Sequence, residues 1–324
     1  MMAKMNPGEP LASGNQSDPS GLQKSARHGV FLGLAAYLTW GSFPVFFKAL
    51  DGAAPLEIVC HRIVWSVVFL FMLVSLRRQL GRVIVALRDR QNLLTLCGST
   101  LLIATNWLVF IYAVQHGEVL QSSLGYFITP LLSVLLGFMF LRERLNRWQL
   151  FSVLLALLGV LNLAFHHSRF PWIALVLASS FGLYGLLRKV ARVEAMVGLT
   201  VETLLLGPFA LGYLVYLSMH QDNTFLAGTL RLDLLLPLSG VVTAIPLLLF
   251  VGAARRLQLA TIGFLQYITP SLHFMLAVGM YNEPFSRGHL VSFLFIWAGL
   301  AIYSSDALWK SRTAWQGRRN GLTL

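Results

Sequence analysis

Acidic side chains are scarce in this sequence, and the shortage limits what the protein can be. The 324 residues include only 13 Asp and Glu, and charged residues together make up 12% of the chain, about half the usual share of a soluble protein. Hydrophobic residues make up 56%. A soluble fold could not cover so apolar an interior with so few polar residues. The composition therefore excludes a soluble enzyme and a disordered chain, and predicts an integral membrane protein.

Several chemical motifs are also absent. The sequence contains no GxxxxGK[ST] phosphate loop, no HExxH, no paired CxxC and no GxSxG. We therefore expect neither an ATP-driven motor nor an enzyme, and no cofactor or metal. The only two cysteines, Cys60 and Cys97, fall in apolar stretches, where free thiols are expected rather than a disulfide.

Ten apolar stretches are long enough to cross a bilayer, which takes about 20 residues of helix. They must be helices, because lipid offers no partner for an open backbone N–H or C=O. The fold expected is therefore all-α and integral to the membrane, with ten transmembrane helices. The stretches are 29–50, 57–76, 92–114, 119–140, 148–166, 171–188, 198–219, 233–254, 259–280 and 287–308. The arginine-rich segment 77–91 is expected to form an amphipathic helix on the inner surface.

Positive charge is distributed unevenly between the two sides that these helices define. Of the 25 Lys and Arg residues, 20 fall on the side that holds both termini, and only Arg169, Arg231 and Arg287 fall on the other. Basic residues concentrate in cytoplasmic connections. The net charge of +12 therefore records topology and not binding to nucleic acid, and both termini are predicted to be cytoplasmic. Residues 1–28 have no apolar core of a signal peptide and are expected to be a disordered tail; residues 309–324 are expected to be a basic tail.

The sequence repeats itself at an offset of 140. Eleven of the 32 positions from 128 to 159 are identical, including Thr129-Pro130 with Thr269-Pro270 and Gly159 with Gly299. At an offset of 141, Gly41 aligns with Gly182. Five spans separate the copies, so the copies must have opposite orientations in the membrane. The sequence predicts two inverted five-helix repeats, 29–166 and 171–308, an arrangement typical of secondary transporters. A duplication with only a structural role is the alternative.

Polar and proline residues concentrate in the repeat-related helices. Pro130 and Pro270 lie within matching spans, and each removes a backbone hydrogen bond. Gate hinges with free carbonyls, or simple packing kinks, would both explain them. Thr129 lies beside Pro130, and His273 lies in the span of Pro270. In isolation such polar side chains more often bond a neighbouring helix than a ligand.

Ionisable residues inside the spans are the sharper candidates, because intramembrane charge is costly. His61 and Arg62 lie near the start of the second span, and Glu202 aligns with His61 at an offset of 141. We expect His61, Arg62 and Glu202 to act in coupling or gating, with proton coupling through His61 and Glu202. The alternative is a set of interfacial ion pairs. Glu57, one turn before His61, can pair with it, and Arg62 can extend toward the membrane surface. Glu143 and Glu283 are expected to stabilise arginines or helix ends.

Specific segments of the chain resemble a known family from about residue 29 to 308. In the first half they are 36–41 (AYLTWG), 61–66 (HRIVWS), 106–107 (NW), 123–131 (SLGYFITPL) and 141–145 (LRERL). In the second half they are 171–175 (PWIAL), 181–189 (FGLYGLLRK), 202–204 (ETL), 253–257 (AARRL), 265–270 (LQYITP) and 283–285 (EPF). The chain resembles the RarD (chloramphenicol-sensitive protein) family, in the EamA branch of the drug/metabolite transporter superfamily.

The resemblance implies a ten-helix carrier of the bacterial inner membrane whose central cavity is lined mainly by the third, fourth, eighth and ninth helices. It implies small metabolites or drugs as substrates, usually exported. Residues of this chain at the implied cavity are Asn106, Trp107, Tyr126, Thr243, Gln266 and Tyr267, and Thr129 is added to the candidate substrate site as a polar residue beside Pro130. We expect a secondary transporter working by alternating access. The alternatives are an uncoupled facilitator or channel, and a membrane-embedded lipid-handling protein. Expected partners are the bilayer, a small molecule and protons, with no nucleic acid.

Overall fold

A computed structural model describes residues 19–141, 145–166, 170–191, 193–227, 229–254, 256–257 and 265–320, and every regular element among them is helical. The first half contains α1 (Pro19–Gly41), α2 (Phe43–Lys48), α3 (Pro55–Leu76), α4 (Leu80–Arg88), α5 (Arg90–Gln115), α6 (Val119–Leu141) and α7 (Arg147–His166). The second half contains α8 (Trp172–Val190), α9 (Ala195–Met219), α10 (Leu230–Ala254), α12 (Ile268–Met275), the π-helical turn η1 (Leu276–Met280) and α13 (Arg287–Asn320).

These helices confirm the membrane fold. Nine helical segments of the described chain are long and apolar enough to span a bilayer, and Ile268–Met280 is a shorter apolar helix where the ninth span was expected. Residues 259–264 of that expected span lie outside the described residues. The arginine-rich segment forms α4, and the expected tails are partly helical, because α1 begins at Pro19 and α13 continues to Asn320. The first span is broken at Ser42, just before Pro44.

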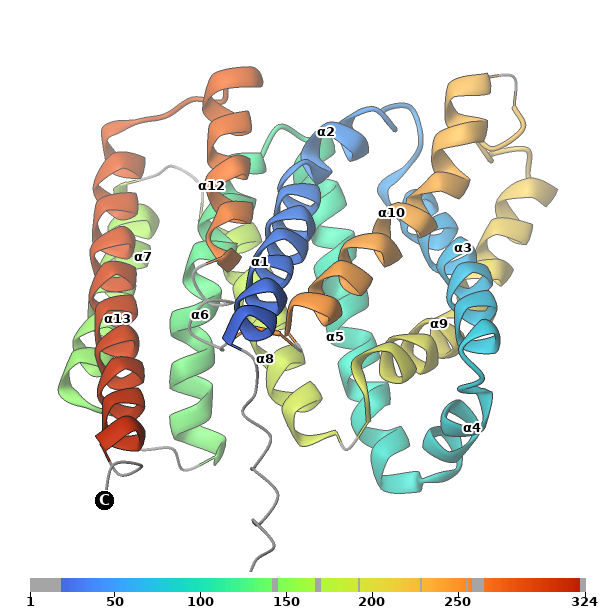
Figure 1. The fold of residues 1–324 in the computed structure, drawn as a ribbon. Helices are drawn as coiled ribbons and strands as arrows, with labels where there is room; N and C mark the ends of the chain where they lie inside the picture. Colours follow the sequence, from blue (N-terminus) through green and yellow to red (C-terminus); the bar gives the residue numbers. More distant parts are fainter. Residues whose placement is uncertain are drawn as a thin grey trace, which may run out of the picture.

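The first helix of each half packs against the opposite half. In the first, α1 lies against α10 and α12, whereas in the second, α8 lies against α5 and α6 (Figure 1). Because α5 and α6 correspond to α10 and α12 in the sequence repeat, the two sets of contacts are equivalent. The halves are therefore interlocked rather than placed side by side.

Glycine contacts show the same equivalence at the level of atoms. A Cβ on Gly159 would lie 2.8 Å from the carbonyl oxygen of Ser292, and a Cβ on Gly299 would lie 2.8 Å from that of Ser152. Gly159 and Gly299 are repeat partners, and so are Ser152 and Ser292. The backbones of α7 and α13 thus touch at two reciprocal points, as in other close helix pairs in membranes.

The second reciprocal set joins α1 to α12 and α8 to α6. A Cβ on Gly41 would overlap the side chain of Leu272, and one on Gly182 would lie 3.3 Å from that of Leu132. Leu132 and Leu272 are again repeat partners. Reciprocal contacts of this kind are what two copies related by a pseudo-two-fold axis produce, and they agree with the inverted repeat.

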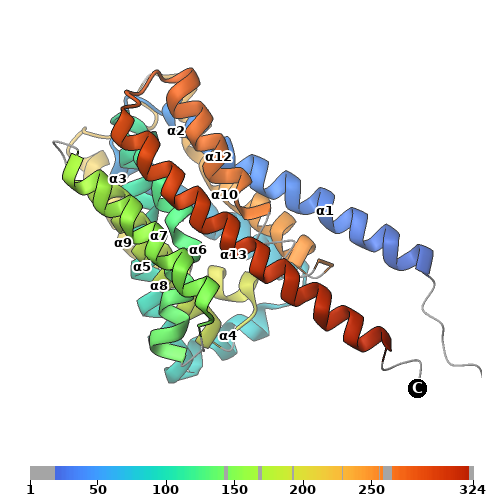
Figure 2. The same ribbon diagram turned by 90° about the vertical axis from the view of Figure 1, so that its left-hand side faces the viewer.

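The two ends of the described chain lie on the same side of the helix bundle. The first turn of α1 and the last turn of α13 project from one side, away from the short loop that follows η1 (Figure 2). An even number of membrane crossings requires this arrangement.

Candidate functional site

A buried arginine lies among aromatic rings in the first half of α3. Arg62, on α3, is only 4% exposed. Its guanidinium carbon lies 4.2 Å from the ring centroid of Trp107 on α5, and 5.4 and 5.8 Å from those of Phe47 and Phe43 on α2. Stacking of this kind stabilises a guanidinium through cation–π attraction. We call Arg62, Trp107, Phe47 and Phe43 the arginine cage.

The cage corrects one expectation from the sequence. Arg62 does not extend toward the membrane surface, because three rings hold its guanidinium inside the protein. Within the described chain, no hydrogen-bond acceptor meets its Nε atom. The charge is therefore buried with aromatic neighbours and no carboxylate.

A polar network connects the cage helix α5 to two other helices. The Tyr126 hydroxyl on α6 donates to Oδ1 of Asn106, at 3.2 Å. The Asn106 amide in turn donates to the Leu177 carbonyl and the Ser180 hydroxyl of α8, each at 3.1 Å. The structure thus brings together three of the residues expected at the cavity, since Asn106 adjoins Trp107.

His273 extends this region to the second half. Its ring stacks on Phe110, with centroids 5.4 Å apart, and lies 5.8 Å from Tyr126. His273 Nε2 donates to the Trp40 carbonyl at 3.2 Å. That carbonyl is free because Pro44, four residues later, has no N–H to offer it. A proline outside the expected hinges therefore creates the acceptor that ties α12 to α1.

The remaining expected cavity residues lie apart from the cage. Tyr267 stacks over Phe127 at 6.5 Å, in a group that includes Phe293 and Trp297 of α13. Its neighbour Gln266 is half-buried. Thr243 and Thr129 are buried and each donates one turn back within its own helix, to Ser239 and Gly125. Among described contacts, none of these joins the Tyr126 network, so their lining of a cavity stays a prediction.

The two expected hinge prolines lie in helices that touch each other. Pro130 lies inside α6, and Pro270 lies in the first turn of α12. The Ser123 hydroxyl of α6 donates to the Pro270 carbonyl at 2.8 Å. This bond joins the two repeat-related helices, while the hinge role itself stays a prediction.

His61 is buried, but its expected partner binds elsewhere. The Glu57 carboxylate accepts the backbone N–H of Thr224 at 2.7 Å, and the His61 ring lies 4.9 Å from that of Phe225. The expected Glu57–His61 pair is therefore wrong for this conformation, because a backbone amide in the connection after α9 takes the carboxylate. His61 Nδ1 meets no hydrogen-bond partner within the described chain.

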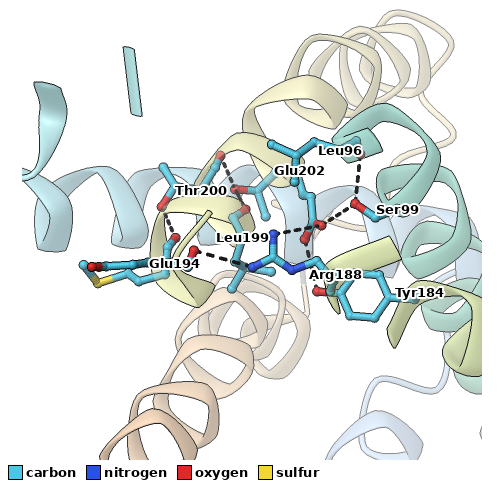
Figure 3. Close-up of polar contacts among 10 residues, drawn as sticks. Leu96, Ser99, Tyr184, Arg188, Glu194, Leu199, Thr200 and Glu202 are labelled. Atoms are coloured by element: carbon cyan, nitrogen blue, oxygen red, sulfur yellow. Dashed lines mark hydrogen bonds and ion pairs between the residues drawn. The ribbon is translucent and has the colours of Figure 1, made fainter. Parts of the chain in front are cut away.

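Glu202, on α9, is the centre of a separate polar cluster (Figure 3). Its side chain is 1% exposed and accepts the Ser99 hydroxyl at 2.6 Å and the Tyr184 hydroxyl at 3.2 Å. Arg188 Nη1 lies 3.7 Å from the same carboxylate. This cluster neutralises Glu202, as the ion-pair alternative anticipated. The sequence did not single out Ser99 or Tyr184, although Tyr184 and Arg188 lie one turn apart on α8.

Glu283 holds a helix end, as expected from the sequence. Its two carboxylate oxygens accept the backbone N–H groups of Val119 and Leu120, both at 2.7 Å. These are open N–H groups of the first turn of α6, where a negative charge also meets the positive end of the helix dipole. Glu143, its repeat partner, lies outside the described residues.

Sequence reasoning missed the phenylalanines of the cage. Phe43 and Phe47 are spaced four residues apart, so they lie on one face of α2, but in a chain with 22 phenylalanines this spacing carries little information. The stronger signal was the position of Arg62 itself. A charge in an apolar span implies nearby groups that stabilise it.

Comparison with known proteins agrees with this architecture. Residues 27–165 match the EamA-like transporter family. "Protein RarD" of Salmonella typhi is 46% identical over 89% of this chain and 98% of its own length, and an "Uncharacterized transporter" of Vibrio cholerae is 44% identical over 91% and 98%. One solved crystal structure has a TM-score of 0.55 at 16% identity, covering 85% of this chain and 96% of its own, which shows a shared fold. The chain therefore belongs to the RarD family of EamA-like membrane transporters.

Proposed function

We propose that this transporter is a secondary-active carrier of small metabolites or drugs that works by alternating access, and that it exports them. The reciprocal contacts of Gly159 with Ser292 and of Gly299 with Ser152 are the observation that carries the proposal. Two copies in opposite orientations can each adopt the shape of the other. Exchanging the shapes converts a site open to one side into a site open to the other. Export is the direction that the family resemblance implies.

Coupling is assigned to His61 and Glu202, with protons as the coupling ion. Both side chains are buried, at 5% and 1% exposure, and they occupy equivalent positions in the two repeats. A titratable group in such a place can bind a proton in one state and release it in the other. Pro130 and Pro270 are assigned as hinges. Pro130 leaves α6 one backbone bond short, whereas Pro270 lies in the first turn of α12, where it removes no bond of that helix and marks its start.

The coupling role is tested with His61→Gln and Glu202→Gln in proteoliposomes. Each is expected to flatten the pH dependence of transport, whereas matched changes at exposed His116 and at Glu118, beside the α6 cap, should leave it unchanged. If both buried variants keep the wild-type pH profile, the coupling role is wrong.

The carrier mechanism has its own test. A thermal-shift screen of a metabolite library on the purified protein identifies a ligand, because a compound that binds the folded state stabilises it. That ligand is then loaded inside proteoliposomes and its labelled form is supplied outside. A carrier accelerates uptake by exchange, whereas a channel or facilitator with an open pore shows no such acceleration. A lipid-handling protein would show no uptake of the labelled ligand, with or without exchange.

Location and activity complete the proposal. The bacterial relatives and the multi-pass fold agree with the inner membrane, and the distribution of basic residues supports cytoplasmic termini. Single cysteines placed in the tails of a variant without Cys60 and Cys97 should react with an impermeant maleimide only after the cells are opened. Membership in a transporter family supports the absence of catalysis.

A further inference from the structure

We propose that Arg62 binds the carboxylate of the transported molecule, so that the substrate is a small organic acid with an apolar body. This inference rests on the proposed carrier function and specifies its substrate class. It begins from a buried cation for which the described chain supplies no anion.

The geometry of the cage explains why an anion would complete it. Aromatic rings attract the flat faces of a guanidinium, because the negative face of the ring meets the delocalised charge. The N–H donors of arginine point outward in the plane of the group, so ring contacts do not satisfy them. Arg62 Nε meets no acceptor within the described chain. A carboxylate fits such an edge through two parallel hydrogen bonds.

Other arginines of the described chain differ from Arg62 in this respect. Arg82 pairs with Glu194 at 2.7 Å, and Arg188 lies 3.7 Å from Glu202. Arg231 donates to the Ala49 carbonyl. Each of these guanidiniums meets an oxygen of the protein, although all three are more exposed than Arg62. Arg62 is thus the most deeply buried of these four arginines and the one without a protein oxygen against its guanidinium, which is unfavourable unless another molecule supplies the partner.

The surroundings of the cage indicate the rest of the ligand. Phe47 of the cage is joined through Phe110 to Tyr126 and His273, with ring centroids 6.0, 6.0 and 5.4 Å from that of Phe110. A ligand that reaches the Arg62 edge would meet rings on several sides, together with the Tyr126 hydroxyl and the Asn106 amide. An aromatic or aliphatic acid suits this setting better than a sugar or a polyamine.

Location supports the assignment to the transport pathway. The cage and its neighbours come from α2, α3, α5 and α6 of the first repeat and from α12 of the second. The cage itself belongs to the first repeat, and its neighbour Phe110 contacts His273 of the second, so its surroundings change when the repeats move relative to each other. A charge at that place can therefore bind a ligand in one state and release it in the other.

The test uses matched pairs of acids and their amides. Benzoate, phenylacetate, 3-phenylpropionate, indole-3-acetate and hexanoate are compared with the corresponding primary amides by thermal shift on the purified full-length protein. We expect at least one acid to stabilise the wild type. Its amide should bind at least about 10-fold more weakly, the loss typical of a charged hydrogen-bond partner. Arg62→Gln should remove this preference, and Arg62→Lys should keep part of it.

Controls separate this proposal from a change in overall charge and from the carrier function. Arg82→Gln removes the same charge at an exposed site that already has a carboxylate partner, and it should keep the wild-type preference. The proposal is overturned if no acid binds more tightly than its amide, or if Arg62→Gln retains the preference. Counterflow of an amine or neutral ligand would then leave the carrier function standing. Acid binding without counterflow would instead support the site and contradict the carrier.

Discussion

The second helices of the two repeats, α3 and α9, align with each other in the sequence repeat, but they carry different ionisable residues in different surroundings. On α3, His61 and Arg62 are buried without a carboxylate, and aromatic rings surround the cation. On α9, the aligned residue Glu202 is buried with two hydroxyl donors and Arg188. One site is left with unmatched charge, and the other is neutralised by its own protein.

The glycine contacts, by contrast, are alike in the two repeats. Gly159 and Gly299 make the same backbone approach in both repeats, and Gly41 and Gly182 approach equivalent leucines. Glycines that set the distance between helices stayed alike in both copies, whereas the buried ionisable residues of α3 and α9 diverged. Divergence within a symmetric frame therefore separates the residues of function from the residues of architecture.

The largest expected effect comes from the shared frame. Gly159→Leu should abolish folded protein, and Gly159→Ala should cost about 1–3 kcal/mol of stability, because the new Cβ would lie 2.8 Å from a backbone oxygen. Gly299→Ala should cost a similar amount. The measurements are monodispersity on size exclusion and the melting temperature.

Gly212 supplies the control for those substitutions. A Cβ at this position on α9 would meet nothing within 4 Å, and Gly212→Ala should be neutral or slightly stabilising, since alanine favours a helix by about 1 kcal/mol. A large cost at Gly159 with none at Gly299 would break the equivalence of the two copies.

The next effect concerns the neutralised site on α9. Arg188→Gln leaves the buried Glu202 carboxylate without its cation and should cost about 2–4 kcal/mol. The double variant Arg188→Gln with Glu202→Gln should lose less than the sum of the two single changes, by about 1–3 kcal/mol. Thermal or denaturant unfolding in detergent measures the coupling. Strict additivity would show that the pair is unimportant for folding.

The unmatched site on α3 should respond in the opposite direction. Arg62→Met removes the buried charge and keeps an apolar side chain against Trp107. The lost cation–π attraction, about 1–2 kcal/mol, is smaller than the burial penalty of an unpaired ion, several kcal/mol. We expect stability to rise by about 1–2 kcal/mol while binding of acids is lost, the exchange of stability for function seen at active sites. A clear fall in melting temperature would make Arg62 a structural residue like Arg188.

The smallest effect is expected where a carboxylate accepts the open N–H groups at the start of a helix. Glu283→Gln should cost about 1 kcal/mol, because one amide oxygen replaces two charged acceptors at the start of α6. Burial raises the pKa of Glu283 above its ordinary value, although the N–H groups of Leu120 and Val119 oppose the shift.

The direction of that pKa shift sets the pH dependence. A carboxyl group with a higher pKa in the folded state contributes most below its unfolded pKa, and the contribution is lost as pH rises through the folded pKa. The stability difference between the wild type and Glu283→Gln should therefore be largest at acidic pH and decrease as the pH rises. Melting curves across pH check this, and a difference that grows with pH would contradict it.

Much of the fold follows from the sequence for simple reasons. Apolar length sets the spans, the distribution of basic residues sets an even number of crossings, and Pro130-to-Pro270 matching reveals the repeat. The break at Ser42 and the short α12 were not predicted, because a local interruption leaves average hydropathy nearly unchanged. Pro44 was visible in the sequence, but its effect on Trp40 depends on His273, which lies more than 200 residues away.

The candidate site was predicted only in part, and the reason is contact rather than composition. Arg62, Asn106, Trp107 and Tyr126 were identified from residue type and position, and they do lie together. The partners of Arg62 and Glu202 could not be inferred, because Phe47, Ser99 and Tyr184 are ordinary residues of membrane helices. Tyr267 was assigned to the same cavity as Tyr126, and it stacks on Phe127, the next residue of α6, whose side chain faces a different set of neighbours.

The crossing of α7 and α13 has one more consequence. The backbones of these two helices touch at two points, with Gly159 against Ser292 and Gly299 against Ser152. At these points no side chain separates the helices. Sliding either helix along the other would drive a carbonyl into a Cα. The pair should therefore move as one rigid body, and the shape change that we propose for transport would fall to the other helices.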